Sequence, residues 1–216
     1  MMDTDRKDNP MDATVKPSSA AAPIAIAASA AALILLVSLH VLSPEYDPSW
    51  RMISEYALGH YAWILSLMFL SWAVGTWALA VALWPRVTTR AGRVGLWLLL
   101  IAGLGEALAA LFDVTQDGMH NLAGLLGTGL PIAAVLISVH LSTLKDWHSV
   151  RKSLLWTAHL TWISVVLLVV TLVLMMMQFA QVNGGQLPQQ PPTTLPPGVW
   201  GLDGWANRFG MVMSCL

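Results

Sequence analysis

Five long apolar stretches constrain this sequence more than any other feature. Each has about 20 residues or more, and at about 1.5 Å of helical rise per residue this is enough to cross a hydrocarbon core about 30 Å thick. The stretches cover residues 24–43, 61–84, 94–113, 121–144 and 155–181. Because backbone polar groups in lipid must bond within their own segment, we expect each stretch to be a membrane-spanning α-helix. The expected fold class is therefore all-α, a polytopic transmembrane helical bundle.

Composition agrees with this expectation and excludes other classes. Only 11% of the 216 residues are charged, against about 25% in a typical soluble domain. A net charge of -1 provides no basic field for a phosphate backbone, so we expect no nucleic-acid partner. The single cysteine, Cys215, excludes an intrachain disulfide framework. The expected partner is the lipid bilayer, together with a lipid or small-molecule ligand.

The segments outside the five stretches predict a tail, a loop and a short sixth helix. Residues 1–22 hold seven charged residues and no apolar period, so we predict a disordered tail before a transmembrane helical domain at 23–216. Residues 182–204 are rich in proline, which favours an extended loop. The apolar segment 205–216 is too short to span, and we expect the chain to end inside a sixth, truncated span.

Orientation follows from the basic residues, because cytoplasmic flanks retain lysine and arginine during insertion. Nine of the eleven lie in the tail and in the loops after the second and fourth stretches. The other two, Arg51 and Arg208, lie on the opposite side. We therefore predict a cytoplasmic N-terminus and an outer proline-rich loop.

One charge lies deep inside a predicted span. Glu106 is in the third stretch, and Asp113 follows seven residues later on the same helical face, at the span's end. A buried carboxylate is costly in hydrocarbon, so Glu106 should face the bundle interior and find a partner or stay protonated. Two interpretations remain open: a proton- or ion-handling site, or a neutral glutamic acid bonded to a Ser or Thr of a neighbouring helix.

A second set of polar residues marks the outer ends of the predicted helices. Antiparallel topology would bring these ends to one membrane face as an outer-face polar cluster. Carboxylates with a histidine could bind zinc or activate water, and Asp113 and His120 would be the metal ligands. The alternative is a structural network that joins Arg208 to carboxylates, and the absence of a His-x-x-x-His pair favours it. The cluster consists of Ser54, Glu55, Asp113, Asp117, His120, Asn207 and Arg208.

Several of these residues carry a resemblance to a known family. The strings are Ser54-Glu55-Tyr56-Ala57-Leu58-Gly59, Phe112-Asp113, His120-Asn121-Leu122-Ala123-Gly124 and Asn207-Arg208. Over residues 24–216 the chain resembles the bacterial multi-pass membrane family called domain of unknown function 998. That family reads Phe-Pro-x-Asp at the end of its third span, and either Asp113 or Asp117 is the counterpart. The resemblance implies six spans and a bacterial inner (plasma) membrane, and it implies no established activity.

Two functional classes follow from these observations. The first is a non-enzymatic integral membrane protein that interacts with lipid or small molecules, or takes part in their transport. The second is a membrane-embedded, metal-dependent hydrolase with an outer-face Ser/Asp/His site. This alternative resembles the ceramidase and progestin-receptor-like superfamily, which also places these residue types at helix ends on one face. The sequence lacks that superfamily's final His pair, and we favour the first class.

The predicted orientation can be tested by cysteine labelling of intact cells. In a Cys215→Ser background, a cysteine at Asp47 should react with a membrane-impermeant maleimide, because it lies in an outer loop. A cysteine at Arg90 should react only after the cells are opened. Labelling of position 90 from outside would reverse the orientation.

Overall fold

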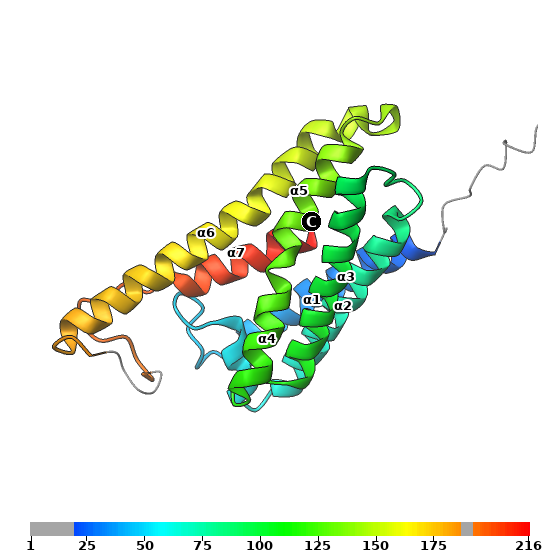
Figure 1. Cartoon of the computed structure of the whole chain (residues 1–216). Coiled ribbons are helices and arrows are strands. Elements are labelled where there is room, and N and C mark those ends of the chain that lie inside the picture. Colours follow the sequence, from blue (N-terminus) through cyan, green and yellow to red (C-terminus); the bar gives the residue numbers. More distant parts are fainter. Residues whose placement is uncertain (1–19, 187–191) are drawn as a thin grey trace, which may run out of the picture.

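The structure is a computed structural model that describes residues 20–186 and 192–216 (Figure 1). The tail predicted over residues 1–22 lies outside these described residues as far as residue 19. Within the described part the chain is helical and contains no strand. The α-helices are α1 (Ala21–Leu42), α2 (Ala62–Leu83), α3 (Arg90–Leu111), α4 (Asp117–Gly127), α5 (Gly129–Leu141), α6 (Arg151–Val182) and α7 (Asp203–Cys215). Two short 3₁₀ helices, η1 (Ile53–Leu58) and η2 (Lys145–Val150), precede α2 and α6.

The five predicted spans are confirmed as helices long and apolar enough to cross a membrane. Their ends differ from the predicted ones by a few residues. Helix α1 begins at Ala21, inside the predicted tail, because a run of alanines favours helix. Helix α3 begins at Arg90 because the Thr89 side chain caps it by accepting the Gly92 N–H at 3.2 Å. The apolar pattern alone does not register such caps.

The fourth span, predicted over 121–144, is divided into two helices. Helices α4 and α5 meet at Thr128, whose hydroxyl donates to the Leu125 carbonyl. Pro131 has no N–H to donate to the carbonyl four residues earlier, that of Gly127, and this weakens the helix at the junction. Helix α4 also begins earlier than predicted, at Asp117, so that His120 lies on a helix and not in a loop.

The helices pack as a sequential bundle with two apolar cores. One core joins α1, α2 and η1 around Leu39, Tyr56 and Met68. The second joins α3 and α5 around Leu96 and Ile137. Helices α6 and α7 lie side by side along the flank of the bundle (Figure 1). Because α7 also contacts α1 and η1, it joins α6 to the first core.

Glycines allow α3 and α4 to approach closely. A Cβ atom added at Gly105 would lie 2.6 Å from the Ala123 carbonyl oxygen and 2.9 Å from the Gly127 amide nitrogen. Both of those atoms are backbone, so the neighbouring helix cannot yield by moving a side chain. Glu106 is the next residue of α3 after this close contact.

This contact predicts that Gly105→Val destabilises the protein. Overpacking a helix interface typically costs about 1–3 kcal/mol, so the apparent unfolding temperature in detergent, followed by tryptophan fluorescence, should fall. Gly118→Ala is the control, because a Cβ there meets nothing within 4 Å and alanine favours helix. Equal unfolding temperatures for the two variants would contradict the close approach.

Candidate functional site

A buried arginine near the start of α7 binds several separate parts of the chain. Arg208 is only 5% exposed. Its Nε donates to His40 Nε2 at 2.7 Å, and its Nη2 donates to the Tyr56 hydroxyl at 3.1 Å. Its Nη1 donates to the carbonyls of Arg51 at 2.7 Å and Gly204 at 3.0 Å. The guanidinium therefore joins α7 to α1, to η1 and to the loop between them.

These contacts differ from the predicted network of Arg208 with carboxylates. The acceptors are neutral, and within residues 20–186 and 192–216 Arg208 forms no ion pair. Glu55 instead pairs with Arg51, at 3.1 Å between Oε2 and Nε. The neutral acceptors come from the Tyr56 hydroxyl of η1 and from the Arg51 carbonyl of the loop before it, whereas Glu55 accepts from the Met52 N–H of its own loop.

His40 is a site residue that sequence reasoning missed. Its Nδ1 lies 2.6 Å from the Leu36 carbonyl and its Nε2 accepts from Arg208. This pattern assigns the single ring proton to Nδ1, so the imidazole is neutral. The only signal in the sequence was a histidine within an otherwise apolar stretch.

Glu55 and Asn207 fix the loop that carries η1. The Ile53 N–H donates to Asn207 Oδ1 and the Met52 N–H donates to Glu55 Oε2, both at 3.0 Å. Burial raises the pKa of Glu55 above its ordinary value, while the nearby Arg51 opposes this shift. The distinctive Ser-Glu-x-Ala-Leu-Gly string thus forms a 3₁₀ helix held by α7.

Asp203 adds a buried carboxyl group to this region. It is the first residue of α7 and is 1% exposed. Burial raises its pKa to about 6. The loop before η1 packs closely here, because a Cβ at Gly204 would lie 2.6 Å from the Pro48 carbonyl oxygen. Sequence reasoning did not single out Asp203, since its burial depends on that loop.

Three other predicted members of the outer-face polar cluster, Asp113, Asp117 and His120, take no part in the contacts of Arg208. Asp113 lies in the turn after α3 and accepts from the hydroxyl and the N–H of Thr115, which lower its pKa. Asp117 is exposed in the first turn of α4. The His120 ring contacts the Phe112 carbonyl through Nδ1 at 3.2 Å. Among the described residues, no group of three or more His, Cys, Asp or Glu side chains could hold a metal ion.

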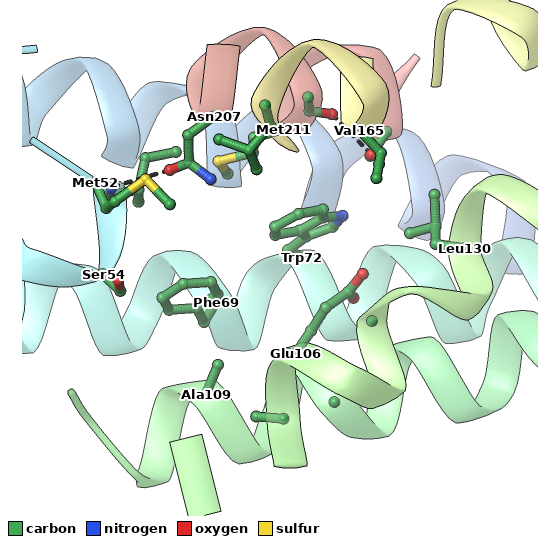
Figure 2. Close-up of a pocket in the computed structure, with 18 of the residues that line it drawn as sticks. Met52, Ser54, Phe69, Trp72, Glu106, Ala109, Leu130, Val165, Asn207 and Met211 are labelled. Atoms are coloured by element: carbon green, nitrogen blue, oxygen red, sulfur yellow. Dashed lines mark hydrogen bonds between the residues drawn. The ribbon is translucent and has the colours of Figure 1, made fainter. Parts of the chain in front are cut away.

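A cavity of about 360 Å³ lies between the helices. Figure 2 shows it bounded by α3 and α4 on one side and by α6 and α7 on the other. Most of its lining is apolar or glycine. The polar residues on its wall are Ser54, Glu106, His120, Ser164, Asn207 and Ser214, together with the indole of Trp72. The predicted residues Ser54, His120 and Asn207 thus share this cavity with Glu106.

Glu106 is the buried acidic residue of this cavity. The residue is 6% exposed, and Thr76 Oγ1 donates to its Oε2 at 2.8 Å. Its Oε1 has no hydrogen-bond partner among the described residues, and neither does Trp72 Nε1. Figure 2 shows the carboxyl group directed into the cavity beside Trp72. Thr76 is therefore the Ser or Thr of a neighbouring helix that we expected for a neutral, hydrogen-bonded glutamic acid. The second oxygen, Oε1, remains available to a group in the cavity.

This fold and cavity define a class: multi-pass helical bundles whose spans enclose an internal polar site. Comparison with family models places residues 26–213 in the family described as "Protein of unknown function (DUF998)". The chain therefore belongs to this family, and the resemblance inferred from the sequence is confirmed. Comparison with curated proteins gave no match, and comparison with solved structures gave none.

The contacts of Arg208 predict a large loss of stability in Arg208→Met. The variant removes the guanidinium donor from four acceptors, two in buried and two in part-buried hydrogen bonds, and the free energy of unfolding should fall by about 3 kcal/mol. Arg86→Met is the matched control, since Arg86 forms an exposed ion pair with Asp146 and such pairs contribute about 0–1 kcal/mol. Thermal unfolding of both purified variants measures the difference. Similar losses would show that Arg208 does not hold α7 in place.

Proposed function

We propose that this chain is a multi-pass membrane protein that binds a small amphipathic molecule in the cavity between its helices. The observation that carries the proposal is a cavity of about 360 Å³ with two buried polar atoms, Glu106 Oε1 and Trp72 Nε1, that lack partners among the described residues. Buried polar atoms are nearly always hydrogen-bonded. A bound molecule that reaches Glu106 or Trp72 would satisfy them.

The lining indicates the chemistry of that molecule. Ligand sites are typically cavities of about 300–1,000 Å³ with an apolar lining and a few placed polar groups. Phe69 and Trp72 lie nearly parallel, 13° apart with ring centroids at 6.3 Å, and both line the cavity. An apolar body would pack against these rings and against Met211, while a polar group would bond to Glu106.

The mouth of the cavity supports entry from the bilayer. Gly124 of α4 and Val165 of α6 line the cavity, yet Gly124 is exposed and Val165 is 39% exposed. The cavity therefore opens between two helices that are apolar enough to cross a membrane. A lipophilic molecule dissolved in the bilayer could enter sideways, which suits a role in transport or in lipid interaction.

The plasma membrane of a bacterium, with a cytoplasmic N-terminus, remains our proposal for location. The loops after α2 and α5 support the orientation, because they meet at one end of the bundle through the Arg86–Asp146 pair at 3.2 Å. These two loops and the residues beside them hold six of the eleven basic residues. Such a basic end is typical of the cytoplasmic side.

Filling the cavity mouth tests the proposed binding. The fluorescence of 1-aminoanthracene, a lipophilic probe that brightens in apolar sites, should rise saturably with the purified protein. Gly124→Phe should weaken this binding about tenfold or more, equivalent to about 1.4 kcal/mol or more, because the ring occupies the mouth.

Gly118→Phe is the control, since Gly118 lies on the same helix α4 but outside the cavity lining. A Cβ meets nothing within 4 Å at either glycine, so neither substitution should clash with the fold. Binding that is unsaturable, or equal in the two variants, would contradict the proposal.

A further inference from the structure

The cavity has the features of a cation site, and this inference rests on the proposed function. We propose that the cavity binds a lipophilic primary ammonium compound, which donates to Glu106 and replaces the proton held by its carboxyl group. Three observations support this: the charge of the lining, the hydrogen-bond acceptors that it offers, and the burial of Glu106.

The charge of the lining favours a cation over an anion. Glu106 is the one acidic residue that lines the cavity, and no Lys or Arg lines it within the described chain. The other titratable groups that face this region are His120 on α4 and Cys215 on α7. The residues that α2, α5 and α6 contribute to the wall carry no titratable group. An anionic ligand would meet a carboxyl group with no compensating positive charge.

Two hydroxyl groups on the cavity wall are acceptors for a ligand, whereas the indole N–H of Trp72 is a donor. The Ser164 hydroxyl donates to the Thr161 carbonyl at 2.7 Å, and the Ser214 hydroxyl donates to the Gly210 carbonyl at 2.8 Å. Each hydroxyl has only one hydrogen, so each oxygen can only accept from a ligand. A primary ammonium has three N–H donors, which matches these two oxygens and Glu106 Oε1. The adjacent Trp72 ring offers a face of the kind that attracts cations.

The burial of Glu106 implies exchange with a proton. A charged carboxylate with one hydrogen bond, from Thr76, and no counter-ion is expensive in this site. The empty cavity therefore holds Glu106 as the neutral acid. When the ammonium binds, the Oε1 proton leaves to water, the carboxylate accepts an N–H of the ligand, and no covalent bond to carbon or nitrogen changes. One proton is released for each ammonium bound.

Three ligands that share one apolar body and differ in their polar group separate the effect of ligand charge on affinity from the effect of ligand size. The full chain in lipid nanodiscs is titrated calorimetrically with 1-adamantylamine, 1-adamantanol and adamantane-1-carboxylate. The ammonium should bind at least about tenfold tighter than the alcohol, equivalent to about 1.4 kcal/mol, and the carboxylate should bind weakest. Affinity for the ammonium should rise with pH, by up to about tenfold per pH unit, as long as Glu106 is protonated in the empty cavity, because one proton is exchanged. Affinity for the alcohol should not change.

Variants of the titratable residues identify the side chain that releases the proton when the ammonium binds. Glu106→Gln should bind the ammonium no better than the alcohol and should lose the pH dependence, while its affinity for the alcohol is retained. His120→Gln and Cys215→Ser are matched controls that should keep the pH dependence, since neither side chain is the proposed acceptor. If Glu106→Gln does not fold, the ligand comparison and the pH dependence of the native chain and the two controls still decide the question.

The outcomes distinguish this inference from the proposed function. If none of the three compounds binds, the proposed binding cavity fails and the inference fails with it. If the alcohol and the ammonium bind equally at every pH, the cavity stands and the ammonium exchange is overturned. Loss of the pH dependence in His120→Gln but not in Glu106→Gln would also overturn it, by assigning the exchanged proton to His120.

Discussion

The buried guanidinium of Arg208 is the interaction on which the rest of the structure depends. Helix α7 is only 13 residues long, so it offers a short apolar surface to its neighbours. Arg208 bonds to His40, Tyr56, Arg51 and Gly204, and Asn207 bonds to the next loop. Because α7 supplies Asn207, Gly210, Met211 and Ser214 to the cavity wall, these bonds also shape the candidate site.

Most buried polar groups of the described chain are hydrogen-bonded, and two buried carboxyl groups, Glu106 and Asp203, depart from this rule; of the two, Glu106 lines the cavity. Arg208 is buried but satisfied by four acceptors, and the Ser164 hydroxyl is satisfied by its own helix. Glu106 is buried to a similar extent with one oxygen bonded and the other directed into a cavity. An incompletely satisfied carboxyl group costs stability, and such a cost is typical of sites that bind or exchange something. The proposed function and the ammonium exchange both start from this difference.

The candidate site was only partly predictable. Glu55, Asn207 and Arg208 were chosen because polar residues at the outer helix ends must share one face, and the structure brings these three together. Asp113 and Asp117 were chosen by the same argument, yet Asp113 is bonded within its own turn and Asp117 is exposed. Topology places residues on a face but does not say which way a side chain points. His40 and Tyr56 were missed because a neutral acceptor has no distinctive signal in an apolar sequence.

The sequence by itself determined the number and the approximate extent of the spans and the presence of one deep carboxyl group. It could do so because apolar length and charge are local properties that a bilayer selects directly. Only the tertiary structure decided that the fourth span divides at Thr128, that α7 is held by neutral acceptors, and that Glu106 faces a cavity with Ser164 and Ser214. The last two features depend on contacts between residues far apart in the chain, whereas the division at Thr128 follows from Pro131 and from a local hydrogen bond.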